Sequence, residues 1–136
     1  MFDKGTGIGV DVVELARLER SLTRSPEAFA ARVFTAAERE RARASARPLE
    51  HFACLFAAKE ALFKAIGLPS GAGFEWRDLD VDPGSARRRP RVRCTGAIGR
   101  HLGDDRLHLA LGTTGKVAMA FAMRVRSETR GVRLEE

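Results

Sequence analysis

Hydrophobic and polar residues alternate near the start of the chain, which predicts a short β-strand over residues 7–13. Ile8, Val10 and Val12 share one face of this strand, whereas Asp11 lies on the opposite face. The Asp11 carboxylate has two explanations at this point, because it either caps the helix that follows or belongs to a functional site.

Three short helices are expected after this strand. Residues 14–24 carry leucines three and four positions apart, which is the spacing of one helix face. Pro26 is typical of a first helical position and starts the second helix. Thr35 and Glu38 form a capping box at the start of the third helix, which gives both side chains a structural explanation.

The most informative element is a helix predicted from Pro48 to Ile66 and ended by Gly67. At about 100° per residue, its large apolar side chains fall on one broad stripe. The stripe consists of Leu49, Phe52, Leu55, Phe56, Leu62, Phe63 and Ile66. Lys59 falls in the middle of the stripe, where burial is costly unless the stem packs and the ammonium finds an anion.

The second half of the chain is richer in strand patterns. After a loop with glycine and proline at residues 68–75, we expect strands over 76–82, 90–95, 107–111 and 117–125, and a helix over 96–102. A strand and helices followed by a strand-rich half predict an α+β fold. We expect one domain over residues 1–126 and a polar tail over residues 127–136.

The composition fits this interpretation. A chain of 136 residues with 44% hydrophobic residues is able to build one core. Cys54 and Cys94 are too few for a disulfide framework or a zinc site, so we interpret them as core thiols. No apolar run approaches the roughly 20 residues of a membrane span, and the first residues do not resemble a secretion signal. We therefore expect a cytoplasmic protein without a membrane partner.

The net charge of +6 favours polyanionic partners, such as phosphorylated cofactors, acidic proteins or nucleic acid. The densest basic segment runs from Arg87 to Arg93, where arginines alternate with Val92 as on an edge strand. No aromatic residue interrupts this segment, so a base-stacking surface is disfavoured. Nucleic acid is therefore not the expected partner.

Asp11, Glu60, Lys59 and Lys64 are the candidate chemical groups. Taken alone, Glu60 and Lys64 are explained by a surface ion pair, since they lie four residues apart on a helix. Two carboxylates without a histidine or cysteine partner favour Mg²⁺, which takes its other ligands from water and phosphate oxygens. A lysine one turn away is able to hold the same phosphate, an arrangement that suits phosphoryl-type transfer.

Two long segments resemble the holo-acyl-carrier-protein synthase group of small phosphopantetheinyl transferases. Residues 7–18, GIGVDVVELARL, resemble the opening motif of that family, and residues 56–67, FAAKEALFKAIG, resemble its second motif. The segment from Arg32 to Glu38 lies between them at the usual spacing, and Pro90 follows in the family order. The resemblance covers roughly residues 5–126 and implies the fold of that family.

The resemblance also implies a reaction and a set of roles. Members move the phosphopantetheine arm of coenzyme A onto a serine of an acyl carrier protein and release adenosine 3′,5′-bisphosphate. By resemblance, Asp11 and Glu60 bind the Mg²⁺ that bridges the pyrophosphate, and Glu60 and Lys64 act in catalysis. Contacts with coenzyme A are implied for Lys59, Lys64, Gly67, Pro90 and Thr113. Contacts with an acidic carrier protein are implied for Arg17, Arg20 and Arg24. Members form homotrimers with sites between subunits, and we expect the same here.

Three positions depart from the family pattern. Leu55 stands where members carry arginine, Thr113 stands where they carry a cofactor-contacting histidine, and Arg89 replaces the glycine before Pro90. A charge-assisted hydrogen bond is worth about 1.5–3 kcal/mol, so the first two changes are expected to weaken coenzyme A binding.

These departures leave three functions open. The first is an active transferase, acting on a carrier of fatty-acid or polyketide biosynthesis that the sequence does not identify. The second is a repurposed member that binds a carrier protein or a coenzyme A thioester without transferring the arm. The third is a polyanion binder. His51, His101 and His108 have no motif context that marks a general base.

Overall fold

The computed structural model describes residues 6–68 and 73–127. Its elements are β1 (Gly7–Glu14), α1 (Leu15–Arg24), α2 (Pro26–Val33), α3 (Ala36–Ala44), α4 (Pro48–Ile66), the 3-10 helix η1 (Trp76–Asp78), β2 (Leu79–Asp82), β3 (Arg91–Cys94), α5 (Gly96–Leu102), β4 (Arg106–Thr113) and β5 (Val117–Val125). The predicted α+β class is confirmed.

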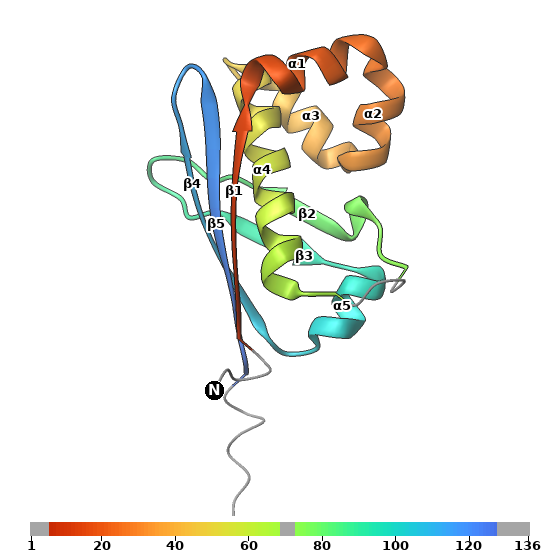
Figure 1. The fold of residues 1–136 in the computed structure, drawn as a ribbon, viewed down its shortest axis with the longest axis vertical. Coiled ribbons are helices and arrows are strands. Elements are labelled where there is room, and N and C mark those ends of the chain that lie inside the picture. Colours follow the sequence, from red (N-terminus) through yellow and green to blue (C-terminus); the bar gives the residue numbers. More distant parts are fainter. Residues whose placement is uncertain (1–5, 69–72, 128–136) are drawn as a thin grey trace, which may run out of the picture.

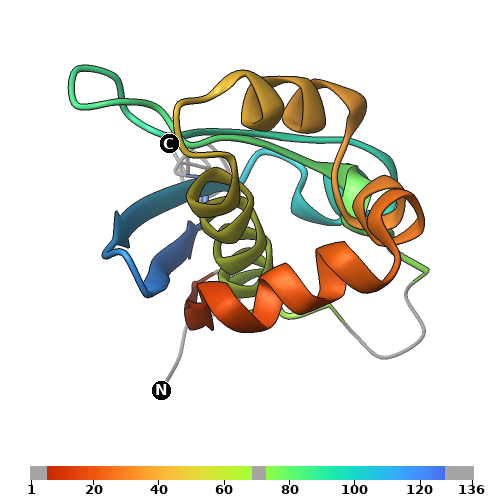
Figure 2. The same cartoon turned by 90° about the horizontal axis from the view of Figure 1, so that it is seen from above.

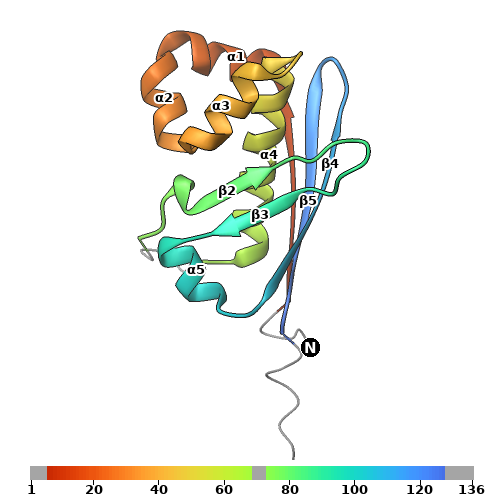
Figure 3. The ribbon, with the colours of Figure 1, turned by 180° about the vertical axis from the view of Figure 1, so that it is seen from behind.

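The strands form two antiparallel sheets. The larger sheet has the order β1-β5-β4, with Val10 opposite Phe121 and Asp11 opposite Ala120. The smaller sheet pairs β2 with β3. Helix α4 lies along the larger sheet, with α1, α2 and α3 toward one end of the molecule and α5 toward the other (Figures 1 and 3). Seen from above, α4 stands between this sheet and the remaining helices (Figure 2).

Small residues allow α4 to approach β1 closely. A Cβ atom added at Gly9 would overlap the carbonyl oxygen of Ala61, and one added at Gly7 would overlap that of Ala65. Ala61 and Ala65 are themselves buried on the facing side of the helix. The helix is therefore buried on an alanine face as well as on the predicted apolar stripe, because glycine and alanine together bring the two backbones into contact.

This packing decides which face of β1 is turned inward. Gly7 and Gly9 face α4, so Asp11 and Val13, which follow at the two-residue period, lie on the same side. Ile8, Val10 and Val12 point to the opposite side of the sheet and are 52–57% exposed. Met119 and Phe121 of the neighbouring β5 are also exposed there. The apolar face of the first strand is thus the outer face of the sheet.

Most predicted boundaries are confirmed within one or two residues. Helix α4 spans Pro48 to Ile66, and Gly67 follows with the positive φ of 65° that ends the helix. Thr35 and Glu38 form both hydrogen bonds of the predicted capping box. Strand β4 is longer at both ends than the predicted segment 107–111.

One predicted strand is partly wrong. Residues 76–78 form the 3-10 helix η1, and β2 begins only at Leu79. The reason is local capping: the Asp78 carboxylate accepts a hydrogen bond from the Glu75 amide at 3.1 Å, and the Asp78 amide donates to the Glu75 carbonyl at 3.0 Å. Of the predicted tail at 127–136, only Ser127 is among the described residues.

The core is shared by the larger sheet, α4 and the surrounding helices. Its fully buried side chains include Phe34, Leu55, Leu62, Leu79 and Ile98. Cys54 and Cys94 are half-buried free thiols packed against this core. Within residues 6–68 and 73–127, no helix has the length and apolar character needed to cross a membrane.

Candidate active site

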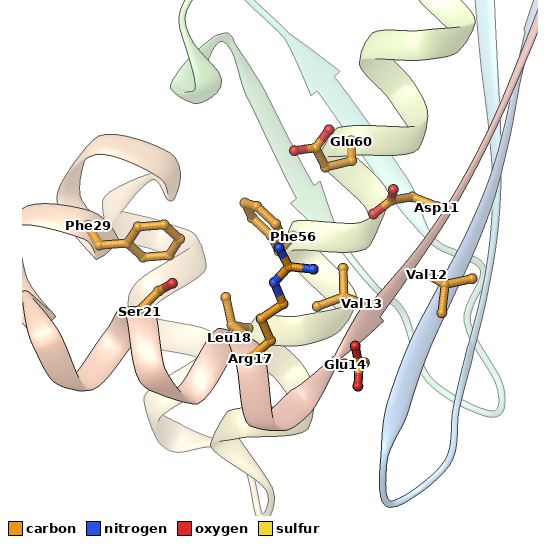
Figure 4. Close-up of a pocket in the computed structure, with 10 residues that line it drawn as sticks. All are labelled: Asp11, Val12, Val13, Glu14, Arg17, Leu18, Ser21, Phe29, Phe56 and Glu60. Carbon is orange, nitrogen blue, oxygen red and sulfur yellow. The ribbon is translucent and has the colours of Figure 1, made fainter.

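A cavity of about 390 Å³ opens where β1, α1, α2 and α4 meet. Asp11 comes from β1, Arg17 from α1, Phe29 from α2, and Phe56 and Glu60 from α4. Figure 4 shows the carboxylates of Asp11 and Glu60 on one side of this pocket and the Phe29 ring on the other. The pocket therefore joins the carboxylates of Asp11 and Glu60 to an apolar wall, and Glu14 also belongs to its lining.

The charge of Asp11 affects Glu60. Glu60 is half-buried, and burial together with the negative charge of Asp11 raises its pKa, while Lys64 partly opposes the shift. Lys64 Nζ lies 3.2 Å from Asp11 Oδ1 and donates a second hydrogen bond to the Val10 carbonyl at 3.0 Å. The structure thus brings together three groups from distant parts of the sequence, since Asp11 and Lys64 are 53 positions apart. A cation between the carboxylates would relieve their repulsion.

Arg17 also belongs to this pocket. Its side chain reaches from α1 toward Phe56, below the two carboxylates (Figure 4). Arg20 and Arg24 are exposed on the same helix, and Arg24 lines a neighbouring cavity with Arg32. The predicted basic helix therefore starts at the pocket and continues away from it. This makes an accessible positive surface beside the carboxylates.

Lys59 does not belong to the pocket. Its side chain is fully buried, its Nζ atom lies 2.7 Å from Glu38 Oε1, and Glu38 is fully buried as well. The anion that this lysine requires is supplied by the protein itself. This arrangement does not support a contact of Lys59 with coenzyme A, because its ammonium has no exposed surface, and that contact stays a prediction from the resemblance.

The remaining predicted contacts lie elsewhere on the single chain. Gly67 lines a cavity together with Lys64, His101 and Arg124, and Pro90 lines another with His108. Thr113 lies in a third cavity, and its hydroxyl donates to Glu50 Oε1 at 3.3 Å. None of these residues lines the pocket of Asp11 and Glu60.

Leu55, the first departure from the family pattern, is a fully buried core residue here. An arginine at this position would have to place its charge inside the core, so the apolar residue matches its surroundings. The departure at position 55 therefore has a local structural explanation, whereas the one at Thr113 concerns an exposed strand end.

Sequence reasoning missed several members of the site region. Phe56 was predicted on the apolar stripe, yet its ring lines the pocket together with that of Phe29, with centroids 6.0 Å apart. Glu38 was explained by its capping box, and its second role as the partner of Lys59 was not foreseen. The available signal was the lysine in the apolar stripe, which required a buried anion from some distant part of the chain.

The donor set suits Mg²⁺ better than a metal held by protein ligands alone. No group of three or more histidine, cysteine, aspartate or glutamate side chains suited to a metal occurs among the described residues. Mg²⁺ commonly takes one or two carboxylates and completes its shell with water and substrate phosphates. Asp11 and Glu60 therefore fit such an ion when a phosphorylated ligand is also bound.

Comparisons with known proteins show which family the chain resembles. The model of the 4′-phosphopantetheinyl transferase superfamily matches residues 7–122. A holo-[acyl-carrier-protein] synthase of Methylorubrum populi is 39% identical over 124 residues, which cover 86% of this chain and 90% of the relative.

Solved structures are similar over most of the chain. The holo-[acyl-carrier-protein] synthase of Neisseria meningitidis has a TM-score of 0.78 and 30% identity, covering 88% of this chain and 98% of that one. The synthase of Bacillus anthracis, solved in complex with CoA (3′,5′-ADP), has a TM-score of 0.71 and 30% identity, covering 89% and 96%.

Proposed function

The chain belongs to the 4′-phosphopantetheinyl transferase superfamily, and we propose that it transfers the 4′-phosphopantetheine arm of coenzyme A to a serine of an acyl carrier protein. The observation that carries the proposal is that Asp11 and Glu60 line one open pocket and that Lys64 pairs with Asp11, in a chain whose relatives are holo-[acyl-carrier-protein] synthases. Two acidic groups and a lysine suit the positioning and charge neutralisation that such a transfer needs.

The proposed step is a displacement at phosphorus. The serine oxygen forms a bond to the phosphorus that carries the pantetheine arm, and the bond from this phosphorus to the oxygen bridging the two phosphates breaks. The bridging oxygen leaves on adenosine 3′,5′-bisphosphate, and the proton of the serine hydroxyl is released. No electrons are exchanged with another molecule, so no oxidant or reductant is required.

We assign Asp11 and Glu60 to Mg²⁺, which when bound neutralises part of the negative charge of the pyrophosphate. The assignment is supported by the raised pKa of Glu60, since burial and the charge of Asp11 disfavour two bare carboxylates in this place. Lys64 is half exposed and lies next to Asp11, so its ammonium is able to reach a phosphate oxygen. Arg17 adds a second cation beside the pocket.

Arg17, Arg20 and Arg24 are proposed to bind the carrier protein. All three are exposed on α1, which starts at the pocket that holds the carboxylates. A row of arginines suits an acidic partner, because complementary charge speeds and orients docking. The carrier serine would then approach Asp11 and Glu60 from the α1 side. A cytoplasmic location and the pathway of the carrier stay predictions.

We further propose a homotrimer in which neighbouring subunits complete the coenzyme A site. Two features support it. Pro90 and Thr113 line cavities that include none of Asp11, Glu60 and Lys64 in the single chain. The outer face of the larger sheet exposes a contiguous apolar surface that consists of Ile8, Val10, Val12, Met119 and Phe121. Exposed apolar patches of this kind mark interfaces.

The test is a mass measurement. The protein is incubated with coenzyme A, Mg²⁺ and each of several apo carrier proteins, and the carrier is analysed for the phosphopantetheine increment. The expected result is an increment that requires Mg²⁺ and disappears with Asp11→Ala. No increment on any carrier, with coenzyme A binding retained, would instead favour the repurposed member suggested by the change at Thr113. Salt-sensitive affinity that depends on Arg87 to Arg93 would favour a polyanion binder.

A further inference from the structure

The Glu38–Lys59 pair is saturated with hydrogen bonds on both sides. Besides its 2.7 Å contact with Glu38, the Lys59 ammonium donates to the Val33 carbonyl at 2.7 Å and to the Trp76 carbonyl at 3.1 Å. All three N–H groups of the ammonium thus have an acceptor. Glu38 also accepts from two backbone amides, that of Val81 at 2.6 Å and that of Thr35 at 2.8 Å.

These contacts connect five segments at one point. Lys59 lies in α4, Val33 ends α2, Glu38 lies in α3, Trp76 begins η1 and Val81 lies in β2. A fully buried ion pair is often less stabilising than a well-packed apolar pair of similar volume, because both charges must leave water. The core of α4 is otherwise made of apolar side chains. The attraction of the two charges therefore accounts for only part of the role of this pair. The pair also supplies hydrogen bonds to backbone groups of four separate segments.

The connected segments carry one wall of the pocket. Phe29 of α2 and Phe56 of α4 line it, and the Trp76 ring stacks on Phe56 with centroids 5.4 Å apart and an interplanar angle of 17°. Lys59 directly precedes Glu60 in α4, so one residue points into the core while the next faces the pocket. Lys59 thereby connects the last residue of α2 and the first residue of η1 to the turn of α4 that bears Glu60.

We propose that Glu38 and Lys59 are positioning residues for the pocket, although neither of them touches a ligand. The pair holds the rings of Phe29 and Trp76 at a set distance from Glu60, so that the carboxylates and the apolar wall keep their mutual arrangement. The consequence for the reaction rests on the proposed function. The structural consequence, which is a displaced wall when the pair is lost, is independent of the proposed function.

An apolar replacement distinguishes a positioning role of the pair from a contribution to overall stability. In the double variant Glu38→Leu/Lys59→Met both charges are removed together, so no unpaired buried charge remains. Trp76 is the only tryptophan of the chain, so its fluorescence reports directly on the wall. We expect a folded protein that melts cooperatively, with stronger quenching of Trp76 by acrylamide and a KM for coenzyme A raised about tenfold or more, while kcat changes less.

A second variant covers the case in which the double variant does not fold. Glu38→Asp keeps the charge and shortens the side chain by one methylene, which pulls Lys59 or breaks its contacts. The same increase in Trp76 quenching and in KM is expected. Arg41→Gln serves as the matched control. This change removes a cation from the same α3–β2 junction, where Arg41 pairs with Asp80 at 3.4 Å. Arg41 has no hydrogen bond to Val33 or Trp76.

The outcomes separate this inference from the proposed function. Wild-type quenching and wild-type KM in a folded double variant, or in Glu38→Asp, would overturn the positioning role while leaving the transferase intact. Absence of transfer by the wild-type protein would overturn the proposed function, and Trp76 quenching in the variants would still decide whether the pair holds the wall. A change in Arg41→Gln equal to that in Glu38→Asp would reduce the effect to general loosening of this junction and overturn the inference.

Discussion

Lys64 Nζ lies 3.2 Å from Asp11 Oδ1, so a lysine of α4 neutralises a carboxylate of β1 across the edge of the pocket. A divalent ion that binds Asp11 must compete with this ammonium for the same charge. Because Lys64 is 54% exposed, the pair is worth at most about 1 kcal/mol and is readily exchanged. Lys64 is thereby free to turn toward a phosphate once the metal is bound.

Replacement of Lys64 should therefore strengthen metal binding and weaken transfer. For Lys64→Gln we expect a Kd for Mn²⁺ without coenzyme A that is lower by up to about fivefold, together with a reduced transfer rate. Titration calorimetry measures the affinity. Arg20→Gln, an exposed change on α1 away from the carboxylates, is the control for net charge. Unchanged or weaker Mn²⁺ binding in Lys64→Gln would show that Lys64 does not compete with the metal for Asp11.

Loss of either carboxylate should remove the joint effect of metal and cofactor on stability. A ligand that binds only the folded protein stabilises it by about 2.7 kcal/mol at 100 times its Kd. Mg²⁺ and coenzyme A together should raise the melting temperature of the wild-type protein by several degrees, and Asp11→Ala or Glu60→Ala should abolish the rise. Glu40→Ala, an exposed position on α3, should retain it. A full rise in the Asp11 and Glu60 variants would exclude them as metal ligands.

Gly9 should tolerate no side chain. In Gly9→Ala the new methyl group meets the Ala61 carbonyl, so β1 and α4 must move apart, at an expected cost of about 1–3 kcal/mol in the free energy of unfolding. Urea denaturation measures the loss. Gly115→Ala, where no atom lies within 4 Å of the new methyl group, should be close to neutral. Equal stability of the two variants would show that the close approach of strand and helix is not needed.

The outer face of the larger sheet should mediate assembly. Phe121→Arg puts a charge in the middle of the exposed apolar surface, opposite Val10, and should convert the expected trimer into monomers. Light scattering after size-exclusion chromatography gives the mass. Ala44→Arg, which adds the same charge at an exposed position at the end of α3, should leave the mass unchanged. A wild-type monomer would contradict the proposed assembly directly.

The two cysteines should be poor nucleophiles in the folded protein. Burial, with smaller effects of Glu50 and Asp78, raises the pKa of Cys54 and of Cys94 to about 11. At pH 8 the thiolate fraction is then about 10⁻³, so reaction with a disulfide reagent should be roughly a hundred times slower than in urea-unfolded protein and should accelerate as pH rises. Rapid labelling of both thiols at pH 8 in the native state would be inconsistent with this burial.

The limits of each helix could be predicted because their causes are local. Pro48, the capping box of Thr35 and Glu38, and Gly67 act within a few residues of their own positions, so the structure repeats what the pattern indicated. The strand predicted from Trp76 was wrong at its start for a similarly local reason, since Asp78 and Glu75 cap a 3-10 turn there. At residues 76–78 this capping prevails over the alternating pattern that indicated a strand.

The sequence by itself determined the family, the candidate roles of Asp11, Glu60 and Lys64, and the need of Lys59 for an anion. These follow from residue types at fixed spacing and from the cost of burying a charge. Only the tertiary structure decided that the anion is Glu38, and that Asp11 rather than Val10 and Val12 lies on the side of β1 that faces α4. Both outcomes depend on contacts between residues far apart in the chain. The close approach of Gly7 and Gly9 to Ala65 and Ala61 decides the second of them.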